Sequence, residues 1–195
     1  MTATETAVPG RASVDALRVA MRRAAAAERA ARATAAEAGT PGWRITPMRE
    51  ADLDAVRALD AAAFPENAWR KGGYPAAMAR REAYVLRLAD GTVAGVHVVR
   101  ESGDGMTVEK IAVRPDLRGQ RLGWWLFRWG MLYAAQAGAP RVTLQVREDN
   151  ARAIAIYQGA GLRVARRMEN HYPTGCPTGL QMQIDLSPTL AGGAA

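Results

Sequence analysis

The stretch Ile111-Ala-Val-Arg-Pro-Asp-Leu-Arg-Gly-Gln-Arg-Leu-Gly123 joins a predicted strand to a predicted helix, and the chain is organised around it. Alternating residues over 109–113 predict the strand, a proline ends it, and the apolar spacing of 122–137 predicts a long helix with a buried face. The N-terminus of such a helix points unpaired amides at the loop before it. Arg118, Gly119 and Gly123 add positive charge and room for close approach, as a pyrophosphate requires. The stretch therefore predicts an anion site. A tight turn without a ligand is the alternative, since the loop is neither a G-x-G-x-x-G nor a Walker sequence.

Two motifs in a fixed order resemble those of the GNAT N-acetyltransferases. The first is Val113-x-Pro115-x-x-Arg118-Gly119-x-x-x-Gly123, which is similar to the acetyl-CoA loop of that family. The second, Asn150-Ala-Arg-Ala-Ile-Ala-Ile-Tyr157-Gln-Gly-Ala-Gly161, resembles its Asn-x-x-Ala-x-x-x-Tyr-x-x-x-Gly segment. The stretches 142–147 and 167–173 are similar to the branch that acetylates the N-terminal alanine of a ribosomal protein. The resemblance covers residues 43–187.

This resemblance implies a mixed α/β fold in which helices flank a central, mostly antiparallel sheet. It implies acetyl-CoA as the donor and an amine as the acceptor, either a protein N-terminus or a small molecule, with direct transfer in a ternary complex. Tyr157 would protonate the leaving thiolate, and Asn150 would contact the pantetheine or phosphate arm. The implied cofactor-binding residues are Ile111, Ala112, Val113, Arg118, Gly119, Gln120, Arg121, Leu122, Gly123 and Asn150.

The chain departs from the family pattern at two positions. Arg121 replaces the first glycine of the usual Arg-x-x-Gly-x-Gly loop, so its backbone must take a conformation that glycine adopts more easily. Gln145 stands where the ribosomal branch carries a catalytic glutamate, and glutamine cannot act as a base. A non-catalytic acyl-CoA-binding module is therefore an alternative to an enzyme.

Glu109 is a candidate general base, because a carboxylate near the start of the loop could take a proton from an amine directly or through water. Strand parity predicts that its side chain shares a face with those of Thr107 and Ile111. An ion pair with a surface arginine is the alternative for Glu109. His97, alone among apolar residues of a predicted strand, is interpreted as a core histidine with satisfied hydrogen bonds.

Cys176 raises the possibility of a covalent acyl-enzyme route, with His171 upstream as its activating base. The sequence shows no third group that would orient this histidine, so direct transfer is favoured. A single cysteine excludes an internal disulfide, predicts no metal cluster and fits a reducing cytoplasm.

The length of 195 residues, with 49% hydrophobic and 23% charged residues, predicts one well-buried core plus an extension. The net charge of +7 comes from 26 basic and 19 acidic residues, and only Lys71 and Lys110 are lysines. Phosphates of a cofactor explain this charge better than nucleic acid does. No apolar run approaches the length of a membrane helix, and a homodimer is compatible with the sequence.

The chain divides into three predicted segments: an Ala- and Arg-rich extension over 1–42 with a mobile or loosely docked helix, an acetyltransferase domain over 43–187, and a flexible tail over 188–195. Besides the 122–137 helix, the apolar spacing predicts an amphipathic helix over 51–60 and another that Asp149 or Asn150 caps and Gly159 ends. Phe64 and Trp69 follow the 51–60 helix, and they either line the acceptor site or close the core beneath a loop. The dense aromatics of the 122–137 helix are interpreted as packing residues. Seven strands are predicted in all, at 43–49, 84–88, 93–99, 106–113, 141–146, 162–170 and 180–186.

Overall fold

A computed structural model describes residues 42–103 and 105–186. The extension predicted over 1–42 lies outside the described residues except for Gly42, as does the tail predicted over 188–195. The three-segment division of the chain therefore stays a prediction.

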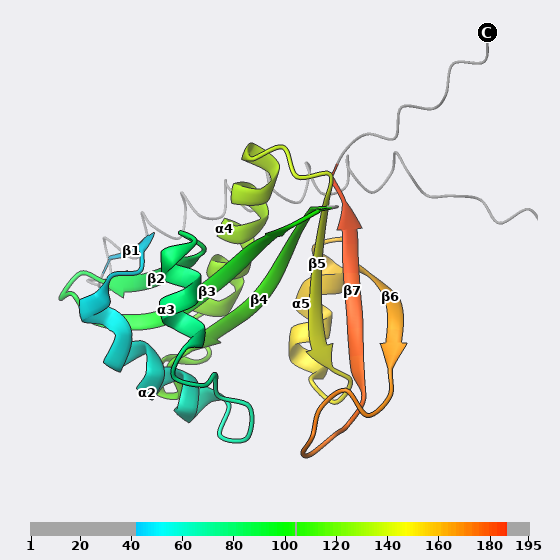
Figure 1. Cartoon of the computed structure of the whole chain (residues 1–195), viewed down its shortest axis with the longest axis horizontal. Coiled ribbons are helices and arrows are strands. Elements are labelled where there is room, and N and C mark those ends of the chain that lie inside the picture. Colours follow the sequence, from blue (N-terminus) through cyan, green and yellow to red (C-terminus); the bar gives the residue numbers. More distant parts are fainter. Residues whose placement is uncertain (1–41, 104, 187–195) are drawn as a thin grey trace, which may run out of the picture.

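The described chain forms one sheet of seven strands in the order β1-β2-β3-β4-β5-β7-β6 (Figure 1). All neighbouring strands are antiparallel except β4 and β5, which are parallel. The mixed, mostly antiparallel sheet predicted from the sequence is confirmed. The strands are β1 (Trp43–Pro47), β2 (Ala83–Leu88), β3 (Val93–Ser102), β4 (Gly105–Val113), β5 (Arg141–Arg147), β6 (Arg163–Met168) and β7 (Gly179–Asp185).

Helices cover both faces of the sheet. On one face, α2 (Leu53–Ala63) and α3 (Gly73–Ala79) pack over β2 to β4, while α4 (Leu122–Gln136) and α5 (Ala151–Gly159) lie on the other face. Two 3-10 turns, η1 (Glu50–Asp52) and η2 (Pro115–Leu117), precede α2 and α4. Helix α3, which is short and begins at a glycine, was not predicted from the sequence.

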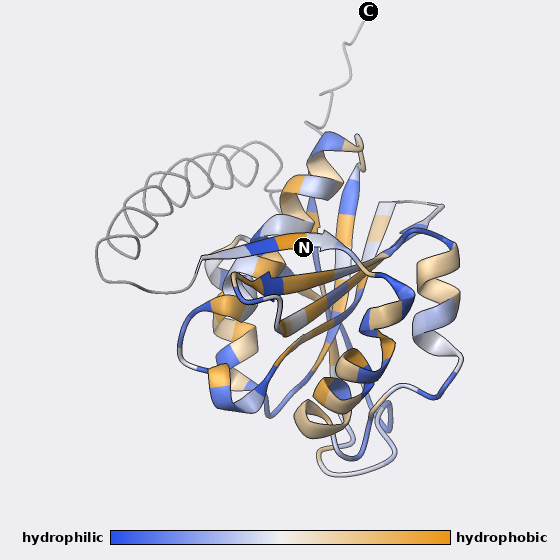
Figure 2. Ribbon diagram, turned by 90° about the vertical axis from the view of Figure 1, so that its left-hand side faces the viewer, coloured by the Kyte–Doolittle hydropathy of each residue, from blue (hydrophilic) through white to orange (hydrophobic). Residues whose placement is uncertain are grey.

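The core is divided between the two faces, and each part is made where apolar strand positions meet an apolar helix stripe. Figure 2 shows the apolar residues gathered in the strands that lie between the helices. One cluster joins α4 and α5 to β4, β5 and β7, and includes Val108, Phe127 and Leu144. A second joins α2 and α3 to β2 and β3 and includes Val56 and Val98, and a third joins α4 to β2 and β3 on the opposite face. The sheet is thus held from both sides, which fixes the position of β4 in the middle.

The aromatic side chains of α4 pack within the domain. Trp129 stacks on Tyr133 at 5.4 Å between ring centroids and lies 4.4 Å from Tyr84 of β2. Trp125 lies 5.5 Å from Trp43 of β1. These contacts confirm that the aromatics serve packing, since they hold α4 against β1 and β2 at one edge of the sheet.

His97 of β3 is fully buried against α4, where its ring lies 5.7 Å from that of Trp129. A methyl group added at Gly130 would lie 2.3 Å from His97 Nε2, so the helix can approach the ring only because residue 130 is glycine. The predicted core position is confirmed. The predicted hydrogen bonds are not present, because neither ring nitrogen has a partner among the described residues. Burial lowers the pKa of His97 to about 3, so the ring is neutral.

Candidate active site

The parallel strands β4 and β5 separate halfway along their length. Met106 to Val108 pair with Val142 to Leu144, and within the described residues the ladder stops there. Beyond this point β4 stays paired with β3 up to Val113, and β5 stays paired with β7 up to Arg147. Figure 1 shows the two strands meeting at one end and diverging toward the other. The gap leaves an edge of β4 over 109–113 unpaired, and three predicted cofactor-binding residues, Ile111, Ala112 and Val113, lie on it.

A β-bulge at Glu109 lies where the gap opens. Val98 pairs with Lys110 and Val99 pairs with Val108, so Glu109 is the extra residue of β4. Val108 and Ile111 both belong to the cluster beneath α4, whereas Lys110 reaches α2 on the opposite face. From Lys110 onward, the bulge therefore exchanges the two faces of the sheet toward which successive side chains of β4 point. Glu109 thus shares a face with Thr107, as predicted, but not with Ile111, and that half of the prediction was wrong.

Glu109 and Gln145 flank the mouth of the gap on one face. The hydroxyls of Thr107 on β4 and Thr143 on β5 lie on this face, 3.0 Å apart. Glu109 comes two residues after Thr107, and Gln145 two residues after Thr143, so both side chains lie on the same face as the hydroxyls. Gln145 is exposed, while the Glu109 carboxylate is 18% exposed and lies 3.0 Å from Arg100 Nε. The ion pair that the sequence left open as an alternative for Glu109 is present.

The loop before α4 has the features of an anion site. Arg121, the N-cap of α4, has φ +62°, the left-handed conformation that the missing glycine would have adopted more easily. No side chain caps this helix, so the amides of Leu122, Gly123 and the following residue point outward without an intrahelical acceptor. Arg118 and Arg121 are exposed, and neither forms an ion pair with a described residue. The loop fits a pyrophosphate, and the arginine at position 121 leaves the amides in place.

Asn150 and Tyr157 belong to α5. Asn150 is its N-cap, where the side-chain oxygen accepts a hydrogen bond of 3.1 Å from the N–H of Ala153, and its amide N–H groups remain available for a ligand. Tyr157 packs in the cluster beneath α4 and α5, with its ring 5.0 Å from that of Phe127. Burial raises the pKa of Tyr157 to about 12. The phenol thus keeps its proton at neutral pH and is suited to donate it.

A buried ion pair fastens the loop between α2 and α3 to β4. Lys110 Nζ lies 3.0 Å from the carboxylate of Asp60, and these side chains are 9% and 1% exposed. The same ammonium donates to the carbonyl of Asn67 at 3.3 Å and lies 4.5 Å from the centre of the Phe64 ring. Asp60 also accepts the N–H of Trp69 at 2.7 Å. Phe64 and Trp69 pack on the core beneath this loop, which was one of the two interpretations of their role. The sequence analysis missed the pair, although a lysine among alternating apolar residues was a signal.

His171 lies in the loop between β6 and β7 and contacts β5. Its Nε2 is 2.9 Å from Oε1 of Gln145, and its ring centre is 4.8 Å from that of Tyr172. Gln145 is therefore the orienting group that the sequence analysis did not find. The thiol of Cys176 donates instead to the carbonyl of Thr178, at 3.8 Å.

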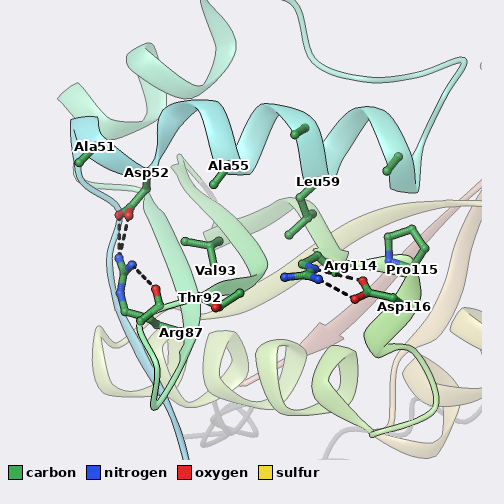
Figure 3. A pocket seen from close by; sticks show the side chains of 13 residues that line it. Ala51, Asp52, Ala55, Leu59, Arg87, Thr92, Val93, Arg114, Pro115 and Asp116 are labelled. Atoms are coloured by element: carbon green, nitrogen blue, oxygen red, sulfur yellow. Dashed lines mark hydrogen bonds and ion pairs between the residues drawn. The ribbon is translucent and has the colours of Figure 1, made fainter.

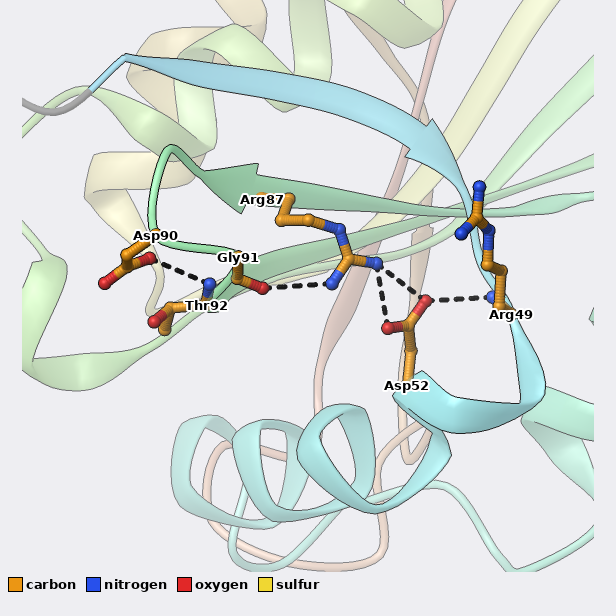
Figure 4. A network of polar contacts seen from close by, with 6 residues as sticks. All are labelled: Arg49, Asp52, Arg87, Asp90, Gly91 and Thr92. Atoms are coloured by element: carbon orange, nitrogen blue, oxygen red, sulfur yellow. Dashed lines mark hydrogen bonds and ion pairs between the residues drawn. The ribbon is translucent and has the colours of Figure 1, made fainter.

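A groove of about 590 Å³ runs beside α2, between it and the loop that enters η2 (Figure 3). Its charged groups are already paired. Arg114 donates to both oxygens of Asp116, at 3.0 and 2.6 Å, which lowers the pKa of that carboxyl. Arg87 donates to Asp52 at 2.8 and 2.9 Å and to the carbonyl of Gly91 at 3.0 Å, in the network of Figure 4. With both guanidinium groups committed, the groove is a poorer phosphate site than the loop before α4.

No group of three or more His, Cys, Asp or Glu side chains within 42–103 and 105–186 could hold a metal ion. Over the same segments, no helix has both the length and the apolar character needed to cross a membrane.

Comparison with known proteins identifies the family. Residues 48–162 match the model of the acetyltransferase (GNAT) family. The chain is 30% identical over 132 residues to the [ribosomal protein bS18]-alanine N-acetyltransferase of Escherichia coli (strain K12), covering 67% of this chain and 87% of that protein.

Two further proteins are similar to this chain, one over most of its length and one over less than half. The crystal structure of the ribosomal-protein-S18-alanine N-acetyltransferase from Escherichia coli superimposes with a TM-score of 0.70 at 27% identity, covering 79% of this chain and 99% of that one. A mycothiol acetyltransferase of Corynebacterium efficiens is 37% identical over 89 residues, covering 45% of this chain and 30% of that protein. The chain therefore belongs to the acetyltransferase (GNAT) family and is an N-acetyltransferase that takes its acetyl group from acetyl-CoA.

Proposed function

We propose that this enzyme acetylates the free amino group at a protein or peptide N-terminus, by direct transfer in one ternary complex. The observation that carries the proposal is the gap between β4 and β5, whose mouth opens on a face of β5 and β7 that no described helix covers. An open, polar face suits an extended peptide, whereas sites for small molecules enclose most of the ligand. The similarity to the bS18-alanine enzyme of Escherichia coli supports the same acceptor class.

The proposed donor site is the loop before α4 together with the gap. The amides of Gly119 to Gly123, with Arg118 and Arg121, would hold the phosphates, and the free edge of β4 over 111–113 would hold the pantetheine arm and the thioester carbonyl. Acetyl-CoA supplies a carbonyl carbon that an amine nitrogen can attack and a sulfur that can leave. The free N–H groups of Asn150 would add a donor beside the arm.

The proposed chemical roles fall on Tyr157 of α5 and on Glu109, which lies where the gap opens. Tyr157 would give its proton to the departing sulfur, because burial keeps the phenol protonated. Glu109 would draw the acceptor ammonium to the mouth and is a candidate to take its proton. One of its oxygens already faces Arg100, which leaves the other for the amine.

Tyr157→Phe tests the proposed acid. The ring keeps its packing on Phe127 and only the hydroxyl is lost, so turnover should fall about 10² to 10⁴-fold while acetyl-CoA affinity is unchanged. Tyr133→Phe on α4 is the matched control, because that ring stacks on Trp129 and has no proposed chemical role. Thiol release gives turnover and calorimetry gives affinity. Unchanged turnover, with a stability loss of about 1 kcal/mol, would assign the hydroxyl to packing instead.

A small-molecule amine is the second candidate acceptor, supported by the local similarity to mycothiol acetyltransferase. A panel of short peptides with free N-termini and small amines separates the two, because the peptide reading requires higher kcat/KM on the peptides. Peptides that begin with alanine are the first choice. We further propose a cytoplasmic location, which the single cysteine supports.

A further inference from the structure

We propose that His171 accepts the proton of the attacking amine and that Gln145 positions it. This assignment rests on the proposed N-acetyltransfer at the β4–β5 gap. It gives a function to a side-chain pair that joins the β6–β7 loop to the mouth of that gap, at 2.9 Å between Nε2 and Oε1.

The position of Gln145 brings the imidazole to the gap. Leu144 is the last residue of β5 that pairs with β4, so Gln145 is the first residue beyond the point of separation. Its side chain lies on the face of Thr143, whose hydroxyl contacts Thr107 of β4, and this is the face that also carries Glu109. His171, in contact with Gln145 and exposed, therefore stands beside the place where an amine must enter.

The Gln145 contact fixes which nitrogen of His171 is basic. A side-chain amide oxygen can only accept, so Nε2 of the imidazole must carry the hydrogen that it donates to Gln145. In the neutral ring, Nδ1 then holds the free lone pair. Gln145 cannot take a proton itself, but it holds the histidine in the tautomer that can.

The ring is also held in place from three sides. Tyr172 lies edge-on at 4.8 Å, and the guanidinium of Arg147 lies 5.4 Å from the other aromatic ring, that of Tyr172. A methyl group added at Gly179 of β7 would lie 2.9 Å from His171 Cδ2, so the imidazole rests directly on backbone. Gln145, Tyr172 and the Gly179 backbone, which contact the ring, are all neutral. A ring seated in this way loses little further freedom when an amine binds.

Glu109 and His171 have different proposed roles at the mouth of the gap: Glu109 attracts the ammonium, and His171 accepts its proton. One oxygen of the Glu109 carboxylate lies 3.0 Å from Arg100 Nε, and the side chain is 18% exposed. The carboxylate is thus placed to attract an ammonium. The exposed imidazole can pass a proton on to water. In Glu109→Gln the attraction is lost, so the KM for the amine should rise more than kcat falls. In His171→Gln, kcat should fall more than the KM for the amine rises.

The proposed step balances. One N–H proton of the ammonium moves to His171 Nδ1, and the freed electron pair forms the N–C bond to the acetyl carbon. The C–S bond breaks with its electron pair left on sulfur, which receives the proton of the Tyr157 hydroxyl. The second proton lost by the nitrogen returns to the Tyr157 oxygen, and His171 releases its proton to water. The products are the amide, the free thiol and one proton.

The test measures kcat and KM with the full chain, acetyl-CoA and an alanine-initiated peptide, by thiol release. His171→Gln should lower kcat by about 10² or more, with KM for the peptide and the acetyl-CoA affinity little changed. Gln145→Leu should lower kcat at least tenfold, because the ring loses its partner. Gln145→Glu should keep the rate, since a carboxylate accepts the same N–H. Gln183→Ala, further along β7, is the matched control and should leave kcat unchanged.

A double variant adds a rescue. Gln145→Glu in the His171→Gln background places a carboxylate at the mouth and should restore kcat at least tenfold over His171→Gln alone. If His171→Gln acetylates the peptide within threefold of the parent chain, the assignment is overturned while the proposed function stands. If Gln145→Leu keeps the parent kcat, Gln145 is not the positioning residue. If the parent chain acetylates neither peptides nor small amines, the proposed function fails and the assignment with it.

Discussion

Lys110→Met should destabilise the domain by about 3–5 kcal/mol, the usual cost of removing one partner of a buried ion pair. The magnitude follows from the burial of the pair, since Lys110 and Asp60 are 9% and 1% exposed. Methionine fills most of the volume of the lysine stem, so the loss of packing is small. What remains is a buried carboxylate that keeps the Trp69 N–H, at 2.7 Å, and the neighbouring Tyr74 hydroxyl, but no cation.

The assay is urea unfolding of the parent chain, Lys110→Met, Asp60→Asn and the double variant. Because each single change leaves one buried group uncompensated and the double change leaves neither, the double variant should be more stable than Lys110→Met. Lys71→Met is the matched control, since the only other lysine is exposed and should matter by less than about 0.5 kcal/mol. A loss below about 1 kcal/mol for Lys110→Met, or additive single effects in the double variant, would refute the reasoning.

Three further changes test other parts of the structure. Gly130→Ala should destabilise the domain by about 1–3 kcal/mol, because its methyl group would lie 2.3 Å from His97 Nε2, and thermal unfolding measures the loss. Burial lowers the pKa of His97 from 6.5 to about 3, so below pH 6.5 the unfolded chain binds a proton that the folded chain does not. The free energy of unfolding should then fall by up to about 1.4 kcal/mol per pH unit as the pH drops from about 6 toward 3, and His97→Gln should remove this slope. Deleting residues 1–42 should leave a cooperative, acetyl-CoA-binding domain, since β1 begins at Trp43, and an insoluble product would show that the domain boundary is wrong.

The elements and the family were predictable because their signals are local. Seven strands and the three longer helices follow from alternation, from 3.6-residue spacing and from turn residues within a few positions. The helix α3 was missed because its first turn, Gly73-Tyr-Pro75, has the composition of a loop. The left-handed backbone of Arg121 was predicted from a missing glycine, since that constraint also lies within one loop.

The site was less predictable because its contacts join distant residues. Lys110 meets Asp60 across 50 positions and His171 meets Gln145 across 26, and no pattern within one element indicates either pair. The face of Glu109 was predicted from strict alternation, which a single bulged residue reverses. A bulge forms only when two strands pair, so the sequence of β4 alone could not reveal it.

The bulge also connects the loop between α2 and α3 with the gap between β4 and β5. Without the extra residue, Glu109 and Lys110 would point to opposite faces of β4, and only one of them could lie on the face of α2. With it, both side chains lie on that face, one toward Arg100 at the mouth and the other toward Asp60 beneath the loop. Because Lys110 binds Asp60, a movement of the loop between α2 and α3 would displace Lys110 and with it the neighbouring Glu109. Changes at Asp60 should alter KM for the acceptor as well as stability, although Asp60 itself does not reach the gap.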